Sequence, residues 1–355
     1  PLVVFIDDLQ WADAPSLNLV KVMMTDPYMT NLLLIGAYRD NEVDPSHPFM
    51  LAVEQLIKEG ATLSTITLPP LKSQDLVQLV ADTLKTNTKK VAELSQLVME
   101  KTNGNPFFVN EFCKNLYQEH LLSFNAETES WGWDIQEINK QELTENVVEL
   151  MMGKIRKLPE ETQDTLKLGA CIGASFDLKT LSVICERPLI QVAKSLWPAV
   201  EHGIILPLNE EHKLLKDLHD ETGQSSKLLN QSEMTDCGMQ AEDRFQHDRV
   251  QQAAYSLIPI NELKPIHLKI GQLLLASADE EILDDKLFYI VEQLNAAREL
   301  MLAENERVEL ATLNLKACIK AKDSTAFGPA AGHAEIGIEL LGNDAWKNHY
   351  ALAFE

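Results

Sequence analysis

The chain has 355 residues, 45% of them hydrophobic, which is enough apolar material for two or three domains with their own cores. Its 31 basic and 54 acidic residues give a formal net charge of −23, which opposes binding to nucleic acid and to anionic membranes. No apolar run reaches the length of a membrane span, and the five cysteines lack Cys-x-x-Cys spacing, so we expect a cytoplasmic protein with buried thiols.

The first residues form an apolar run that stops at two carboxylates. Residues 2–6 are rich in β-branched side chains, and Asp7 and Asp8 follow them. Such a run predicts a parallel strand buried on both faces, and its carboxyl end is where open α/β sheets place their ligands. The pattern is that of a Walker B strand, in which one carboxylate holds the Mg²⁺ shell through water and its neighbour orients the attacking water.

We therefore predict Asp7 and Asp8 as catalytic residues and Asp7 as the Mg²⁺ and nucleotide ligand. The alternative interpretation is a strand end with two solvated acids. Nearby, Trp11 is expected to pack and Asp13 to cap a helix.

The phosphate-binding loop that should precede a Walker B strand is not in the sequence. Such a loop needs Gly-x-x-x-x-Gly-Lys-Ser/Thr, whose amides and lysine surround the phosphates. The only Gly-Lys pair is Gly153-Lys154, which follows the acidic strand and lacks the earlier glycine. We expect the sequence to be part of a larger protein and to bind nucleotide poorly by itself.

A second apolar run, residues 32–38, ends at Arg39. A cation at the end of the neighbouring strand can reach a γ-phosphate and stabilise charge in the transition state, so Arg39 is a third predicted catalytic residue. The alternative is a surface arginine paired with Asp40 or Glu42.

The alternation of strands and helices in residues 1–72 predicts the C-terminal half of a P-loop NTPase core with a parallel sheet. The further elements expected there are helices at 14–24 and 49–59 and a third strand at 65–68.

After this core the pattern is mostly helical. Residues 73–139 predict a helical lid, and residues 261–355 predict the start of a TPR-like helical repeat region. Residues 140–260 predict a winged-helix domain with an acidic, loosely ordered insertion at 209–242. Its expected helices are 147–158, 160–172, 178–185 and 189–202, and its expected hairpin strands are 203–208 and 243–248.

Three segments resemble the predicted-ATPase (AAA-type, STAND) module of large bacterial sensor kinases. They are Val-Val-Phe-Ile-Asp-Asp-Leu-Gln-Trp-Ala-Asp at 3–13, Gly-Ala-Tyr-Arg-Asp-Asn-Glu-Val at 36–43 and Asn-Gly-Asn-Pro-Phe-Phe-Val-Asn-Glu-Phe at 103–112. The resemblance implies binding of ATP or ADP with Mg²⁺. It also implies linked kinase and GAF-type domains in the same polypeptide, protein partners that bind through the helical repeats, and an ATP-dependent oligomer.

The resemblance gives a role to two further residues. Gly104-Asn105-Pro106 resembles the lid element in which the proline packs on adenine, so Pro106 is a predicted nucleotide-binding residue. Phe-Gln-His-Asp at 245–248 resembles the Met-His-Asp motif, whose histidine contacts the β-phosphate of ADP, so His247 is a second. The alternatives are a helix cap followed by a proline stop and a surface or capping histidine.

The implied function is a slow regulatory ATPase switch, closed with ADP and open with ATP, that relays a signal to linked kinase domains. One alternative is a degenerate ATPase fold that acts as a protein-interaction scaffold. Another is the ATPase module of a transcription regulator.

Overall fold

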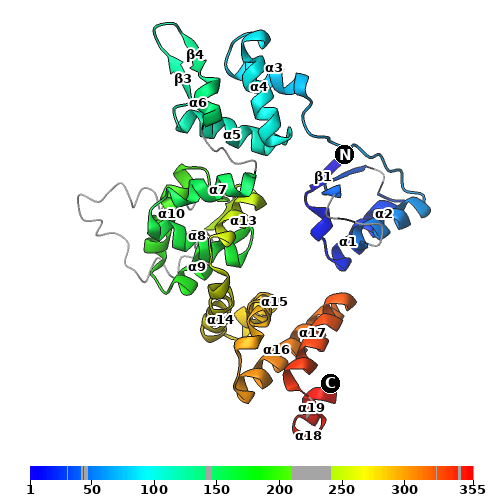
Figure 1. The fold of residues 1–355 in the computed structure, drawn as a ribbon. Helices are drawn as coiled ribbons and strands as arrows, with labels where there is room; N and C mark the ends of the chain where they lie inside the picture. Colours follow the sequence, from blue (N-terminus) through cyan, green and yellow to red (C-terminus); the bar gives the residue numbers. More distant parts are fainter. Residues whose placement is uncertain are drawn as a thin grey trace, which may run out of the picture. The chain divides into compact units, whose positions relative to one another are not determined.

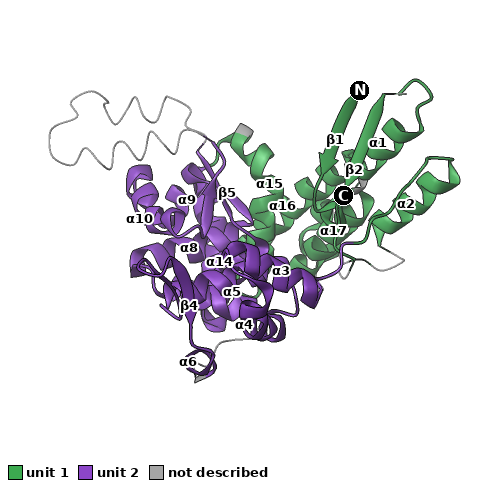
Figure 2. Ribbon diagram, turned by 90° about the horizontal axis from the view of Figure 1, so that it is seen from above, with its two compact units in different colours: residues 1–67, 278–355 green, residues 68–277 purple. Residues whose placement is uncertain are grey.

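The structure is a computed structural model, and it is mostly helical with small sheets. It describes residues 1–29, 31–40, 43, 47–140, 146–209, 241–324, 326–342 and 345–354 (Figure 1). The chain divides into two compact units, one made of Pro1–Thr67 with Ala278–Glu355 and the other of Leu68–Ser277 (Figure 2). The predicted division into four domains stays a prediction.

The N-terminal segment contains the two expected parallel strands. β1 (Leu2–Ile6) pairs with β2 (Leu32–Gly36), in a register that places Leu2 beside Leu32 and Ile6 beside Gly36. A short 3-10 helix (Leu9–Trp11), α1 (Ala14–Thr25) and α2 (Pro48–Lys58) complete the segment. The carboxyl ends of both strands therefore lie at the same edge of the sheet, which is the arrangement that the predicted site requires.

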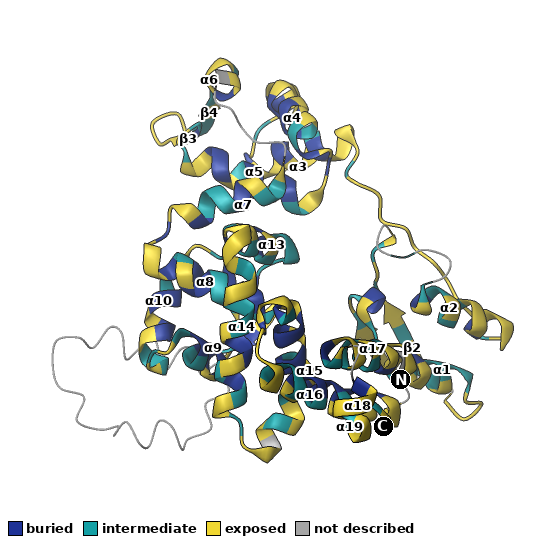
Figure 3. Cartoon of the chain, turned by 60° about the horizontal axis from the view of Figure 1, so that its bottom comes forward, coloured by how far each residue is buried: buried dark blue, intermediate teal, exposed yellow. Residues whose placement is uncertain are grey.

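The prediction that these strands are buried on both faces is wrong for this structure. Val3 and Phe5 of β1, and Leu33 and Ile35 beside them on β2, are between 44% and 62% exposed (Figure 3). Only the other face is covered, by a small core around Leu9, Leu17 and Phe49. The described residues supply helices for one face of the sheet alone, and so its two faces differ.

The third predicted strand is also not formed. Residues 61–72 have no regular structure, and Ile66 and Leu68 are 82% and 88% exposed. A strand needs a neighbour for its backbone groups, and the structure pairs β1 and β2 only with each other. The apolar residues at 65–68 were therefore not sufficient to pair this segment with β1 or β2.

Residues 73–140, where a helical lid is predicted, contain three expected helices, one further helix and a hairpin that was not predicted. The helices are α3 (Ser73–Thr83), α4 (Thr88–Thr102), α5 (Pro106–Gln118) and α6 (Ile135–Lys140). The hairpin joins β3 (Leu122–Asn125) and β4 (Ser130–Trp133), with Trp131 packed edge-on against Tyr117 and Phe124.

The next segment contains the helices and hairpin strands on which the winged-helix prediction depends, while the winged-helix assignment itself stays a prediction. Its helices are α7 (Val147–Arg156), α8 (Glu160–Ile172), α9 (Leu178–Cys185), α10 (Leu189–Glu201) and α13 (Asp248–Ser256). Its antiparallel sheet has the order β5 (Ser175–Asp177), β7 (Glu242–Phe245), β6 (Ile205–Pro207). Most of the predicted acidic insertion, 210–240, lies outside the described residues.

The remaining residues are helical, as the repeat prediction expects. The helices are α14 (Ile260–Ser277), α15 (Glu280–Ala296), α16 (Glu304–Asp323), α17 (Phe327–Leu341), α18 (Ala345–Asn348) and α19 (Tyr350–Phe354). Asn295, Asn314 and His333 join α15, α16 and α17 through hydrogen bonds of 2.9 to 3.1 Å. Because Asn295 and Asn314 are buried, this polar ladder fixes how the three helices pack.

The described cysteines are free thiols, and Cys171 is buried while Cys113, Cys185 and Cys318 are half-buried. Burial raises the pKa of Cys113 to about 11 and that of Cys171 to about 12, so both remain neutral thiols at neutral pH. Cys237 lies outside the described residues.

Among the described helices, none is both long and apolar enough to cross a membrane.

Candidate functional site

The two predicted carboxylates follow β1 directly, and they differ in environment. Asp7 is exposed, whereas Asp8 is half-buried and has a left-handed backbone with φ 53° and ψ 41°. This conformation is uncommon for a residue other than glycine, and such residues are concentrated at functional sites. The Asp8 N–H donates to Asp7 Oδ1 at 3.0 Å, and the next residue, Leu9, donates to Ala37 O beyond β2 at 2.9 Å. The chain turn after β1 is thereby fixed to the end of β2.

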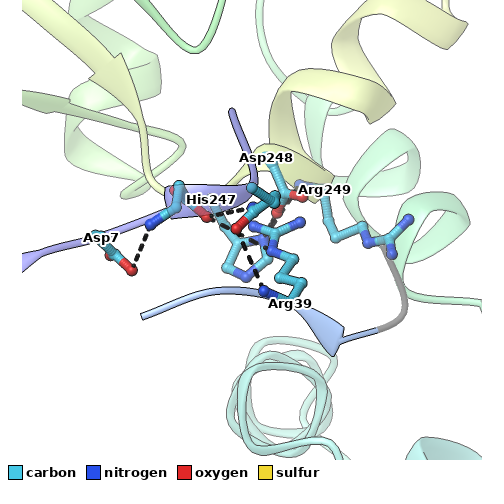
Figure 4. Close-up of polar contacts among 7 residues, drawn as sticks. Asp7, Arg39, His247, Asp248 and Arg249 are labelled. Carbon is cyan, nitrogen blue, oxygen red and sulfur yellow. Dashed lines mark hydrogen bonds and ion pairs between the residues drawn. The ribbon is translucent and has the colours of Figure 1, made fainter. Parts of the chain in front are cut away.

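A buried glutamine connects the turn formed by Asp7 and Asp8, here called the acidic turn, to Arg39. Gln10 is 5% exposed, its Nε2 donates to Asp8 Oδ1 at 3.0 Å, and its Oε1 accepts from the Arg39 N–H at 3.3 Å. The Arg39 side chain also lies beside Asp8, with 3.7 Å between Nε and Oδ1 (Figure 4). The structure thus brings Asp7, Asp8 and Arg39 together, and Arg39 pairs with Asp8. Asp8 is not one of the alternative partners, Asp40 and Glu42, and Glu42 lies outside the described residues.

Gln10 is a candidate functional residue that was not predicted from the sequence. A buried amide that bonds both to a carboxylate and to the backbone beyond the next strand holds the carboxylate in one orientation, as a supporting residue does in enzyme sites. The signal available in the sequence was the position of Gln10 two residues after Asp8.

The two neighbouring residues for which minor roles were expected behave differently. Asp13 caps α1 as predicted, because its Oδ1 accepts from the Ser16 N–H at 2.9 Å. Trp11 is not a core residue: it is 57% exposed, and the Arg39 guanidinium carbon lies 5.3 Å from its ring centroid. This cation–π contact helps to orient Arg39.

The carboxylates fit the predicted Mg²⁺ in part. Mg²⁺ is usually bound by one or two carboxylates together with waters and substrate phosphates, so an exposed Asp7 beside Asp8 has suitable donors. No group of three or more acidic, histidine or cysteine residues that could hold a metal by itself exists in the described part of the chain. The phosphates of a nucleotide would have to supply the remaining ligands.

The lid element at 103–106 is a tight connection between α4 and α5. Asn103 ends α4 in the left-handed region, Gly104 follows with φ +70°, and Asn105 caps α5 by accepting from the Phe108 N–H at 3.0 Å. Pro106 is the exposed first residue of α5. The cap and proline stop of the alternative interpretation are therefore present, and they leave Pro106 exposed at the start of a helix.

His247 is the N-cap residue of α13, and its ring is held through Nδ1. The Arg249 N–H points at Nδ1 at 3.1 Å and at Asp248 Oδ1 at 2.8 Å, and Nδ1 also contacts Asp248 Oδ1 (Figure 4). A neutral ring whose Nδ1 accepts the cap bond carries its hydrogen on Nε2, and an imidazolium paired with Asp248 carries one there as well, whereas a neutral ring that donates Nδ1–H to Asp248 does not. In the first two arrangements Nε2–H is a donor of the kind that a phosphate oxygen accepts.

The lid element and His247 meet through an aromatic contact. The Phe107 ring, one residue after Pro106, stacks on the His247 ring with centroids 4.1 Å apart and an angle of 18° between the planes. The structure therefore brings Pro106 and His247 into the same region of residues 68–277. No role for Phe107 was predicted from the sequence.

Two curated histidine kinases are similar to this chain. Over 364 aligned residues the chain is 31% identical to hybrid signal transduction histidine kinase G of Dictyostelium discoideum, and the match covers 91% of this chain and 10% of that protein. It is 23% identical over 143 residues to the peroxide stress-activated histidine kinase of Schizosaccharomyces pombe, covering 39% of this chain and 6% of that protein. The chain thus spans about a tenth or less of the length of these relatives.

A solved structure also matches, that of a Signal Transduction ATPase with Numerous Domains (STAND) protein with a tetratricopeptide repeat sensor from Pyrococcus horikoshii. Its TM-score is 0.41 at 15% identity, covering 96% of this chain and 43% of that one. No protein-family model matches the chain. Over most of its length, then, the chain is similar to a segment of a hybrid signal transduction histidine kinase.

Proposed function

We propose that the chain is the nucleotide-dependent regulatory part of a longer signal-transduction histidine kinase and responds to the exchange of ADP for ATP. The similarity to hybrid histidine kinase G supports the signalling role. The arrangement of Asp8, Gln10 and Arg39 at the carboxyl ends of two parallel strands supports nucleotide binding. Linked kinase and GAF-type domains, and protein partners at the helical repeats, belong to this proposal.

In this proposal Asp7, Asp8 and Arg39 have different roles in ATP hydrolysis. Bound with Mg²⁺, ATP supplies the γ-phosphoryl group for slow hydrolysis. Asp7 would hold the hydrated ion, and Asp8, kept in place by the Gln10 amide, would orient the attacking water. Arg39 contacts Asp8 loosely at 3.7 Å, so its guanidinium can turn from Asp8 to a phosphate oxygen.

The lid and His247 would hold the closed state. Pro106 is exposed and can pack on adenine, and Nε2–H of His247 can donate to a β-phosphate oxygen of ADP. Contacts that exist with ADP and are lost with ATP would shift the protein between two conformations. This difference in contacts is what a switch requires.

Replacing His247 with alanine in the full-length polypeptide should speed the release of ADP. A hydrogen bond to a charged phosphate oxygen contributes about 1.5–3 kcal/mol, so we expect release about 10- to 150-fold faster. The measurement is the dissociation rate of a fluorescent ADP analogue chased with unlabelled ADP.

The matched control is His202→Ala, a second histidine near a helix end, whose Nδ1 lies 2.7 Å from Pro198 O at the end of α10. This variant should release ADP at the wild-type rate. An unchanged rate in His247→Ala would remove this residue from the mechanism.

A further inference from the structure

The stack of Phe107 on His247 joins the two motifs of residues 68–277 in which nucleotide contacts are predicted. Phe107 lies in the first turn of α5 directly after Pro106, and His247 precedes the first turn of α13. With centroids 4.1 Å apart and planes 18° from parallel, the phenyl ring covers one face of the imidazole. The lid therefore supplies a contact that restricts how the His247 ring turns.

Charged and polar groups beside the imidazole contact its Nδ1 atom rather than the ring face that Phe107 covers. Asp248 and the Arg249 N–H contact Nδ1 at the start of α13, and the side chain of Arg249 is bonded to Gln252 on the same helix. These contacts fix one nitrogen of His247, while Phe107 fixes the plane of the ring. Together they determine where Nε2 points.

Helix α5 is tied to the rest of residues 68–277 at a second point. Glu111, one turn after Phe107, accepts from Lys154 of α7 at 2.5 Å and is only 4% exposed at its side chain. Since α7 packs on α13, the position of α5 relative to His247 is set by this ion pair as well as by the stack. The place of Phe107 beside His247 therefore depends on this ion pair as well as on the stack.

We infer that Phe107 is a positioning residue that holds the imidazole of His247 in the orientation in which Nε2–H meets the β-phosphate of ADP. Because Phe107 follows Pro106 directly, the adenine contact and the phosphate contact depend on each other. Separation of α13 from α5 separates the rings and releases this phosphate contact. The inference rests on the proposed function of His247.

The stack itself is tested in the 355-residue chain by NMR of selectively labelled histidine. The phenyl ring should shift the His247 ring protons upfield, and Phe107→Leu should abolish this shift while Phe107→Tyr retains it. Phe124→Leu is the matched control, because this phenylalanine packs edge-on against Trp131 and should leave the His247 signals unchanged. His247 signals that are the same in wild type and Phe107→Leu would overturn the inference.

The positioning role is tested by ADP release from the full-length polypeptide. Phe107→Leu should release ADP about 3- to 10-fold faster than wild type, and Phe107→Tyr should restore the wild-type rate. The double variant with His247→Ala should be no faster than His247→Ala alone, because Phe107 acts through His247.

The outcomes separate this inference from the function on which it rests. If His247→Ala speeds release but Phe107→Leu does not, or if the two effects multiply, the inference is overturned and the proposed function stands. If His247→Ala has no effect on bound ADP, or no ADP binds, the closed-state contact proposed for His247 fails and the inference with it.

Discussion

Replacing Gly104 with alanine is expected to lower the free energy of unfolding of residues 68–277 by about 3 kcal/mol. Gly104 has φ +70°, and a Cβ atom built there would lie 2.4 Å from the backbone oxygen of Leu71. The same close approach carries the hydrogen bond from the Leu71 N–H to Gly104 O at 2.9 Å. An alanine at position 104 would therefore be strained by the left-handed backbone and would also clash with the Leu71 backbone, and both effects lower the free energy of unfolding.

Gly203→Ala provides the matched control. Gly203 belongs to the same unit and has φ +65°, but a Cβ atom there would meet nothing within 4 Å. Gly203→Ala should lower the free energy of unfolding by about 1 kcal/mol, which is the penalty for the left-handed backbone alone. Urea denaturation with hydrogen exchange of the α4 and α5 amides measures both variants, and equal losses would show that the approach to Leu71 has no effect on stability.

Glu111→Gln is expected to lower the same free energy by about 3 kcal/mol. Burial by itself would raise the pKa of Glu111, but hydrogen bonds from Lys114 at 2.8 Å and Lys154 at 2.5 Å outweigh it and hold the pKa below its ordinary value. The Lys154 side chain is only 12% exposed, so removing the carboxylate charge leaves a largely buried ammonium without its partner. Hydrogen exchange in α5 and α7 should report the loss.

The sign of the pH dependence follows from the lowered pKa of Glu111. Its contribution to stability is fully present above the unfolded value of about 4.3 and is lost as pH falls through the folded pKa. Wild type should therefore lose stability below about pH 4.3, and Glu111→Gln should lose less over that range.

The control is Glu119→Gln, which changes the more exposed ion pair with Lys157. This variant should lower the free energy of unfolding by less than about 1 kcal/mol. Profiles of the same shape for wild type and Glu111→Gln would contradict the role of the ion pair between Glu111 and Lys154.

Local signals in the sequence were sufficient to predict most helices. The predicted bounds of 160–172 and 178–185 agree with α8 and α9, because amphipathic periodicity and caps such as Asp177 are properties of neighbouring residues. β5 was missed because it has three residues and takes its pairing from β7, far along the chain. The strand predicted at 65–68 was wrong for the related reason that an apolar run does not provide a partner.

The same distinction applies to the candidate site. Asp7 and Asp8 could be predicted because their signal, an apolar run ending in acids, is contiguous. The role of Gln10 depends on Arg39 beyond the next strand, and the role of Phe107 depends on a histidine that caps a different helix. Those contacts are set by packing, and only the structure places the side chains together.

The most direct test of nucleotide switching is the identity of the nucleotide retained by the full-length polypeptide. The protein is purified and denatured, and the released nucleotide is identified by chromatography, with an Asp7→Ala/Asp8→Ala variant in parallel. We predict stoichiometric ADP in the wild type and changed occupancy or hydrolysis in the variant. A wild-type protein that carries no nucleotide and does not take up ATP with Mg²⁺ would contradict the proposal and favour an interaction scaffold.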